Sequence, residues 1–462
     1  MTARPSSTLA NQSPWRLRRK YFLRASSARW ALIILAVFFF TGWLAPWLAN
    51  DQPWYIQLNG EHYYPAFSTQ KVYTTPEGEV LRLAETDWKR LKFESVIWAP
   101  IPYAPGKTDR WNGYLNAPYK GPFDAQYFQH PAAGKQALSW RFRHWLGTGR
   151  NGEDVLSGVI HGTRSSMGIA LGAMLMATLV GLLLGSLAGF YGDNRFRWSR
   201  GILLGVALGA FGGFFLVFGR KAWHWSSAEA MENETNWGWG LLSFLLLLIL
   251  GGVFGKASEK LGRWWIAPVR LPLDAFMLRL LEVFHAVPHF VLVIALAALI
   301  VTPNWWSLVL VLGITSWTNI ARLVRAELFR VRELDYLEAA RSLGLSNSQL
   351  LWRHALPNAI SPSIVAIAFG VGSIILLESG LSFLGIGLPP DQVSWGQLIR
   401  SGQNDFSAWW LVVFPGLALL FTVLAFNWIG EAMRDAFDPR TLPGSKRVTE
   451  TTEEEVIQDI QS

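Results

Sequence analysis

The sequence has 462 residues, of which 51% are hydrophobic, and it contains 25 tryptophans and 28 phenylalanines. This composition is too apolar and too aromatic for an ordinary soluble domain, and it predicts a membrane protein. We attribute the formal net charge of +8 to membrane topology and contact with lipid rather than to nucleic-acid binding. The absence of cysteine excludes disulfide bonds and thiol chemistry.

The N-terminal part combines a basic tail, residues 1–29, with a first apolar run, residues 30–49. Because no small-residue cleavage site follows this run, it predicts a transmembrane anchor and not a cleaved signal peptide. By the positive-inside rule the tail is cytoplasmic, and alternation of the later spans places both termini in the cytoplasm. The short loops DNRFRWSR and KASEKLGRWWIAPVR are also basic, so we expect them on the cytoplasmic side.

A polar segment, residues 50–163, follows on the outer side and is long enough to fold into an extracytoplasmic domain. Stretches such as KVYTTPEGEVLRLA predict β-hairpins, because apolar and polar residues alternate in them. The acidic residues and histidines of the segment lack the spacing of a catalytic or metal site. We therefore expect a module that either docks a partner or packs on neighbouring loops.

The rest of the chain is dominated by apolar runs. Including the first, eight runs approach the ~20 residues that cross a bilayer: 30–48, 166–190, 201–218, 240–254, 290–301, 306–323, 364–377 and 410–429. They divide this part into a helix with its loop (164–200), an inserted hairpin of spans (201–255), a core (273–430) and a cytoplasmic tail (431–462). The expected fold class is an all-α polytopic membrane protein with about eight transmembrane helices and an extracytoplasmic insertion.

Between two of the apolar runs lies a charged segment, residues 322–357, which we expect in the cytoplasm. Its local signals describe two helices with a sharp joint. The first helix should end at Gly344, because glycine is a common C-cap residue. Ser346 and Gln349 have the spacing of a capping box that starts the second helix. This second helix should end near Pro357.

One face of the first helix is apolar, because Tyr336, Ala339, Ala340 and Leu343 recur at helical spacing. The two alanines in its middle would let the backbone of another helix approach closely. Such a stripe either packs on the chain's own spans, which is its more common role, or faces a soluble partner. The residues of this helix leave both possibilities open.

The stretch EAARSLGLSNSQLLWRHALP resembles the cytoplasmic signature of bacterial ABC importer permeases. Six residues stand at the spacing of that signature: Glu338, Ala339, Ala340, Gly344, Leu356 and Pro357. His354 departs from the general signature, in which isoleucine is frequent at this position. RHALPNA is nevertheless similar to the peptide-transport branch of the family.

Other stretches resemble the C-type permeases of oligopeptide and dipeptide importers. They include LGTGRNGEDVLSGVIHGTRSSMGIAL, LLESGLSFLGIGLPPDQVSWGQLI and IGEAMRDAFDPR, and the likeness covers residues 145–190 and 273–440. The first span and LANDQPW are similar to permeases of the Yej type. Gly149 and Glu153 stand where the family usually has Asp and Arg, and the hairpin 201–255 is additional to the usual six spans.

The resemblance implies the type I permease fold of ABC importers in a bacterial inner membrane, with peptides moved by alternating access. It implies that the cytoplasmic helix lies in a groove of an ATP-hydrolysing subunit. The implied partners are a second homologous permease, two ATPase subunits, an extracytoplasmic peptide-binding protein and membrane lipid. The implied ATPase-coupling residues are Asp335, Tyr336, Glu338, Ala339, Ala340, Leu343, Gly344, His354, Leu356 and Pro357.

We expect no catalytic residue, cofactor or metal in this chain. IPYAPGKT and LGGVFGKA come nearest to an ATP-binding loop, but both lack its first glycine. His285 and His289 have the spacing of two metal ligands, yet no third ligand is near and Pro288 bends the segment. Glu282 and Glu378 lie near membrane depth, where charged residues usually face a cavity, so they are candidates for lining the pore.

The alternative function is a self-contained secondary transporter or a membrane scaffold. A secondary transporter should show acid or histidine relays within the membrane and an internal repeat. The sequence contains few candidates for such relays and no recognisable repeat, which favours the ABC permease.

Overall fold

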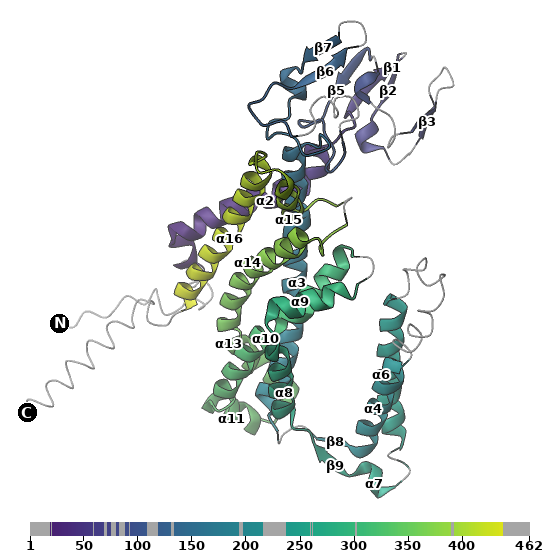
Figure 1. Ribbon diagram of the computed structural model, residues 1–462. Helices are drawn as coiled ribbons and strands as arrows, with labels where there is room; N and C mark the ends of the chain where they lie inside the picture. Colours follow the sequence, from purple (N-terminus) through teal and green to yellow (C-terminus); the bar gives the residue numbers. More distant parts are fainter. Residues whose placement is uncertain are drawn as a thin grey trace, which may run out of the picture.

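The computed structural model describes residues 19, 21–58, 60–68, 72–74, 80–82, 88–91, 93–108, 119–130, 134–193, 197–215, 237–258, 260, 262–300, 303–389 and 392–437. A bundle of long helices lies between a strand-rich module at one end and a short helical hairpin at the other (Figure 1). The all-α polytopic fold class is confirmed, and the described strands lie in the strand-rich module and in one small ribbon.

Within the part of the chain that the structure describes, five helices are long and apolar enough to cross a bilayer. They are α2 (Ser26–Leu48), α3 (Val155–Tyr191), α10 (Trp305–Val331), α14 (Ser361–Leu384) and α16 (Trp410–Phe437). The helices α8 (Leu273–Ala286) and α9 (His289–Ala298) meet the criterion together and are bent by 84°, which brings the number of spans to six. The break lies at Val287 and Pro288, where proline cannot donate a helical hydrogen bond.

The most extensive helix contact of the bundle joins α3 to α10. Glycines spaced four residues apart on α3 face the backbone of α10. A Cβ at Gly185 would lie 2.5 Å from the carbonyl oxygen of Ala321, and one at Gly181 would lie 2.9 Å from that of Trp317. Side chains of any other type would hold the two helices apart, so the glycines set the helix separation.

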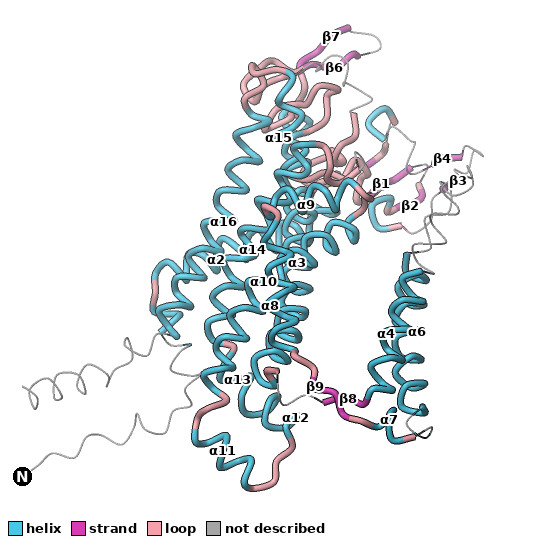
Figure 2. The backbone as a smooth tube through the Cα atoms, turned by 60° about the horizontal axis from the view of Figure 1, so that its bottom comes forward, coloured by secondary structure: helices cyan, strands magenta, loops and turns pink. Residues whose placement is uncertain are grey.

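The helices α4 (Arg200–Phe214) and α6 (Trp237–Ser258) pack against each other and stand apart from the bundle (Figure 1, Figure 2). Gly205 and Gly251 face one another so closely that a Cβ on either would run into the other's carbonyl oxygen. The apolar stretches described in this pair, Arg200–Gly213 and Leu246–Ser258, are shorter than a usual span. The two additional spans expected at 201–255 therefore stay a prediction.

A two-stranded ribbon connects this pair to the bundle (Figure 2). It consists of β8 (Arg197–Ser199) and β9 (Pro268–Arg270), with the short helix α7 (Arg263–Ile266) beside it. The two basic loops that the sequence places on the cytoplasmic side thus pair with each other.

The strand-rich module is built from three small antiparallel units. In the first, β1 (Tyr55–Leu58) lies between β2 (Glu61–Tyr63) and β5 (Ser95–Ile97); the others are β3 (Val72–Thr74) with β4 (Val80–Arg82), and β6 (Tyr127–His130) with β7 (Gly134–Ala137). Short 3-10 turns follow at η1 (Pro65–Phe67), η2 (Trp88–Arg90) and η3 (Trp140–Phe142). Ile56, Trp88 and Trp98 form its small buried core. The pairing of β3 with β4 confirms the hairpin expected in KVYTTPEGEVLRLA.

The remaining elements lie at the two ends of the bundle. At the end opposite the module are α11 (Asp335–Ser342), α12 (Asn347–Gln349), the π-helical turn η8 (Leu350–Ala355) and α13 (Leu356–Ala359). On the module's side are α15 (Trp395–Ser401) and η9 (Gly402–Asn404). The expectations for the two terminal tails fall mostly on residues 1–18 and 438–462, which lie outside the described residues.

Candidate functional site

The helix α11 follows the last turn of α10 at the end of the bundle farthest from the module (Figure 1). Asp335 and Glu338 occupy its first turn and Arg341 its last, so the charges complement the helix dipole. Gly344 has a φ of +85°, a conformation that favours glycine. The predicted end of this helix at Gly344 is therefore confirmed.

A single buried residue, Leu337, holds α11 against the bundle. The predicted apolar face lies elsewhere on the helix: Tyr336 is 40% exposed, Leu343 is 85% exposed and Ala339 is exposed. Ala340 alone of this face is half-buried. Most of the face thus remains open in this chain, and exposed apolar side chains of this kind are typical of an interaction surface. The sequence analysis missed Leu337, although its spacing of three from Ala340 was a signal for a buried stripe.

The joint after Gly344 has the predicted capping box. The side-chain oxygen of Ser346 accepts a hydrogen bond from the Gln349 backbone at 3.3 Å, and Oε1 of Gln349 accepts one from the Ser346 backbone at 3.1 Å. The helix that starts here buries Leu350, Leu351 and Ala355 in the core of the bundle. Each helix of the hairpin is therefore held in place by side chains buried in the bundle, and the joint between them is held by the capping box.

The second helix ends at Ala359, two residues after Pro357, which agrees with the expected end near this proline. Pro357 lies inside α13, and α14 begins two residues after that helix, at Ser361. The π-helical turn before it widens the helix, and Pro357 falls in the first turn of the new α-helical segment. A proline is tolerated there because its missing N–H is not needed for an intrahelical bond.

Tyr336 connects the two helices of the hairpin. Its hydroxyl donates to the backbone carbonyl of His354 at 3.4 Å, and Nδ2 of Asn358 donates to the same hydroxyl at 3.1 Å. Nδ2 of Asn358 also bonds the His354 carbonyl at 2.9 Å. The structure thus brings Tyr336 and His354 together through the backbone and adds Asn358, which stands in the RHALPN stretch but was not selected from the sequence.

An ionic cluster joins this end of α10 to α8 and α3. The guanidinium of Arg325 forms two hydrogen bonds with the Asp274 carboxylate, one of them between Nη2 and Oδ2 at 2.8 Å. Oδ1 of Asp193, directly after α3, accepts from the backbone N–H groups of Asp274 and Ala275 at 3.0 Å each. Because Arg325 lies within two turns of the end of α10, this cluster gives the hairpin a rigid connection to three spans.

The two candidate pore-lining acids lie in different surroundings. Glu282 on α8 is exposed and accepts from Nη1 of Arg279 at 2.7 Å. Glu378 on α14 is completely buried, and Oε1 accepts from the Ser382 hydroxyl at 2.8 Å. The pore-lining role stays a prediction for both, and only Glu282 reaches the surface of this subunit.

The histidine pair considered as a metal site is split by the helix break. His285 lies in the last turn of α8 and His289 is the first residue of α9, with the 84° bend between them. The single helical face that their spacing requires is therefore missing. Among the described residues, no group of three potential metal ligands occurs.

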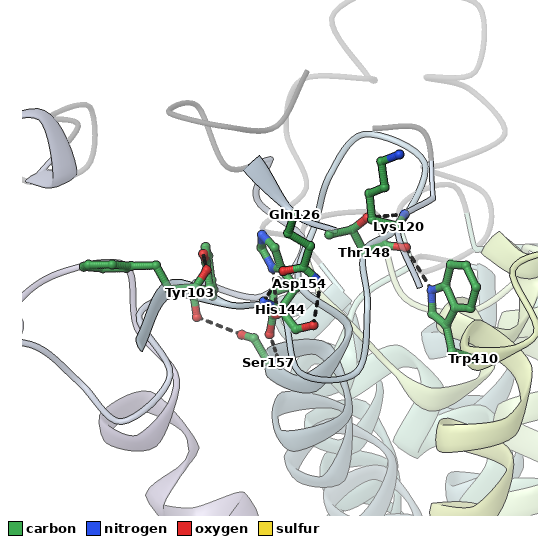
Figure 3. Close-up of polar contacts among 9 residues, drawn as sticks. Tyr103, Lys120, Gln126, His144, Thr148, Asp154, Ser157 and Trp410 are labelled. Carbon is green, nitrogen blue, oxygen red and sulfur yellow. Dashed lines mark hydrogen bonds and ion pairs between the residues drawn. The ribbon is translucent and has the colours of Figure 1, made fainter. Parts of the chain in front are cut away.

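At the end of the bundle next to the strand-rich module, Asp154 fixes the start of α3 to the module (Figure 3). Its Oδ2 accepts from the backbone of Ser157 at 2.7 Å, and its Oδ1 accepts from Nδ1 of His144 at 2.8 Å. The ring of Tyr103 stacks on His144 with centroids 4.1 Å apart. The Ser157 hydroxyl donates to the Tyr103 carbonyl at 2.9 Å. One carboxylate therefore serves as both helix cap and module anchor.

The helix α16 contributes a second attachment of the module. Nε1 of Trp410, its first residue, donates to the carbonyl of Thr148 at 3.1 Å (Figure 3). The hydroxyl of Thr148 in turn accepts from the Lys120 backbone at 2.8 Å. Gly147 has a φ of +84° and would place a Cβ 2.8 Å from the indole nitrogen. The module is thus bonded to the first residues of two spans.

The two departures from the family pattern fit each other. The backbone of Gly149 donates to the carbonyl of Glu153 at 2.8 Å. A Cβ at Gly149 would lie 2.5 Å from Oε2 of Glu153, so glycine leaves room for this carboxylate. The carboxylate also accepts from Asn151 at 3.0 and 2.7 Å.

The comparison with protein families matches residues 264–443, the range that runs from α7 through α16. The matching family is described as binding-protein-dependent transport system inner membrane component. The range contains the hairpin with α11, the ionic cluster's Asp274 and Arg325, and four of the six spans.

Similar proteins include the inner membrane ABC transporter permease protein YejE of Escherichia coli (strain K12), which is 28% identical over 438 residues, 93% of this chain and 97% of that protein. A protein of Brucella ovis that carries the name of a peptide permease is 38% identical over 203 residues, 43% of this chain and 64% of its own length. A protein of Brucella suis biovar 1 named for a peptide transport system permease is 37% identical over 202 residues, 44% of this chain and 65% of its own length. The matched range, the helical bundle and the hairpin signature confirm the resemblance of this chain to the inner membrane components of binding-protein-dependent transport systems, the permeases of ABC importers.

Proposed function

We propose that this chain is a permease subunit of an ATP-driven importer that moves peptides or peptide-like solutes across a bacterial inner membrane. The family domain supports the transport function, and the names of the Brucella relatives support the class of solute. The chain itself provides the membrane spans. ATP hydrolysis takes place on partner subunits.

The open face of α11 is the observation that carries the proposal. Tyr336 and Ala339 are exposed on this short helix, and Leu343 is exposed directly after it. Leu337, on another side of the helix, is buried in the bundle. A helix fixed in this way can enter a groove of an ATPase subunit without detaching from its own spans. Groove binding by the apolar face of a helix is a common mode of recognition.

Closure of the ATPase subunits then moves the spans through rigid contacts. The helix α10 is continuous from Trp305 to Val331 and ends three residues before α11. The bonds of Arg325 to Asp274, and of the α8 backbone to Asp193, make α10, α8 and α3 move together at this end. A displacement of α11 is therefore transmitted to the helices of the bundle, because a flexible loop does not absorb it.

The complete transporter contains a second homologous permease, which closes the pore, two ATPase subunits and an extracytoplasmic binding protein that delivers the solute. The module anchored at Asp154 and Trp410 lies on the side from which the solute arrives, and α11 lies on the cytoplasmic side. Both termini are accordingly cytoplasmic, in line with the basic N-terminal tail. A self-contained secondary transporter is not favoured, because the family domain belongs to binding-protein-dependent systems.

The experiment is to replace Ala339 by arginine in the reconstituted transporter. Ala339 is exposed in this chain, so Ala339→Arg should insert into the membrane and assemble with the second permease normally. A long charged side chain at a close helix contact should prevent the ATPase subunit from seating. Substrate-stimulated ATP hydrolysis should then fall to the basal level.

Ser26→Arg is the matched control, because it adds the same charge at an exposed position of α2 outside the hairpin. It should retain stimulated hydrolysis and uptake. Normal stimulation in Ala339→Arg would remove the coupling role from α11.

A further inference from the structure

The ribbon β8–β9 and the adjoining ends of α4 and α6 carry basic residues and no acidic residue among those described. Within residues 197–215, 237–258, 260 and 262–270 the charged residues are Arg197, Arg200, Lys256, Lys260, Arg263 and Arg270. Among the described residues the charges of this region are thus all positive, while Glu259 lies outside them. A surface with an excess of positive charge attracts anions.

Two of these arginines lie directly opposite each other. In the antiparallel pairing, Arg197 on β8 faces Arg270 on β9, so both side chains project from the same face of the ribbon. Side chains in this position are about 5 Å apart at Cβ, and like charges there repel. Both are exposed, and neither forms an ion pair with a residue that the structure describes. An anion between the two guanidinium groups would replace this repulsion by two charge-assisted hydrogen-bonding contacts.

The surroundings indicate which kind of anion fits. The other face of the ribbon carries Trp198 and Val269, both half-buried. Apolar side chains are exposed within about one helical turn of the basic ends, namely Leu204 on α4 and Phe254 on α6, and Ile266 is exposed beside β9. The surface therefore changes from cationic to apolar over a short distance, as a phospholipid does from its phosphate to its acyl chains.

We propose that Arg197 and Arg270 together bind the phosphodiester of an anionic phospholipid in the cytoplasmic leaflet. The acyl chains of this lipid lie along the exposed apolar faces of α4 and α6. The bound lipid holds the ribbon at the membrane surface and thereby fixes the helix pair beside the bundle. This site goes beyond the transport function, since neither α11 nor the pore takes part in it.

The test uses the full-length chain purified in detergent and titrated with phosphatidylglycerol, with binding followed by native mass spectrometry. The double variant Arg197→Gln/Arg270→Gln should bind phosphatidylglycerol about thirtyfold more weakly, because each basic residue near an anionic surface contributes about fivefold. Arg197→Lys/Arg270→Lys keeps the charges but loses the planar fork, so its affinity should be intermediate. Phosphatidylcholine, which has no net charge, should bind weakly to all forms.

The matched control is Arg24→Gln/Arg29→Gln, which removes the same charge from two exposed arginines at the start of α2. It should keep the affinity of the unchanged chain. Equal losses in the two glutamine variants would overturn the proposal, because they would reflect net charge alone. Displacement of the lipid by inorganic phosphate at comparable concentration would also overturn it in favour of a free-phosphate site. Helix content from circular dichroism and elution volume in size-exclusion chromatography show whether the glutamine variant is misfolded. If it is, the lysine variant decides, and an unchanged affinity of that variant for phosphatidylglycerol overturns the proposal.

Discussion

At the scale of single residues, Leu337 of α11 and Leu343, the residue directly after this helix, have opposite environments. Leu337 is fully buried and Leu343 is 85% exposed. Six residues along a helix correspond to a rotation that places the two side chains on different sides. Leu337 therefore contributes to the stability of the chain, and Leu343 is available for contact with a partner.

Substitution of each leucine by alanine should separate these roles. Leu343→Ala should leave the thermal unfolding of the isolated chain unchanged and weaken binding of the ATPase subunit about tenfold, as for a buried apolar residue at an interface. Leu337→Ala should lower the free energy of unfolding by about 2–5 kcal/mol, because it leaves a cavity in the bundle. Thermal unfolding in detergent and surface plasmon resonance with the ATPase subunit provide the two measurements. A loss of stability in Leu343→Ala comparable with that of Leu337→Ala would contradict the assignment.

At the scale of elements, small residues determine how closely helices approach. The pair α3 with α10 and the pair α4 with α6 both place glycine against a neighbouring backbone. Within membranes such close contacts supply van der Waals packing, since lipid removes most of the hydrophobic drive for helix association. Gly185 is the position on α3 where even a methyl group would meet the carbonyl of Ala321 at 2.5 Å.

Gly185→Ala should therefore destabilise the bundle, although alanine is the better helix former. Forcing α3 away from α10 is expected to cost about 1–3 kcal/mol of unfolding free energy. Gly416→Ala on α16 is the control, because a Cβ there would meet no atom within 4 Å. Its stability should be unchanged or slightly higher in the same denaturation experiment. Equal stability of the two variants would show that α3 and α10 can separate freely at this point.

At the scale of the whole molecule, the strand-rich module is bonded to the spans and also has exposed aromatic residues on its surface. Its anchors are the Asp154 and Trp410 contacts, which lie at the first turns of α3 and α16. Phe123 is 88% exposed and Trp140 is 75% exposed on the module. Large exposed aromatic side chains are frequent in protein interfaces, which favours a docking role for the module over packing alone.

Phe123→Ser/Trp140→Ser should abolish stimulation of ATP hydrolysis by the extracytoplasmic binding protein while basal hydrolysis continues. The expected cause is loss of the aromatic contact, because neither side chain belongs to the buried core of the module. Tyr64→Ser/Phe67→Ser removes two other exposed aromatics of the module and should retain stimulation. Full stimulation and full peptide uptake in the first variant would reduce the module to a packing role. Stimulation and uptake are measured with the transporter in proteoliposomes.

The sequence by itself determined the features that depend on neighbouring residues. The capping box of Ser346 and Gln349, the helix end at Gly344 and the pairing of β3 with β4 each rest on hydrogen bonds or dihedral angles within a few residues. The apolar runs likewise predicted the helices that cross the membrane, because a span must satisfy its own backbone and face lipid. The π-helical turn before Pro357 was not predicted, because no simple local pattern encodes it.

The tertiary structure alone decided which surfaces these elements bury and which they leave open. Arg325 and Asp274 are 51 residues apart in the sequence, and no periodic pattern of residues predicts their contact. The same holds for the pairing of Arg197 with Arg270 and for the buried position of Glu378. On α11, the pattern identified an apolar face, yet the bundle covers Leu337 and leaves Tyr336 and Leu343 exposed. The reason is that burial depends on the packing of helices distant in sequence, whereas periodicity reports only one helix at a time.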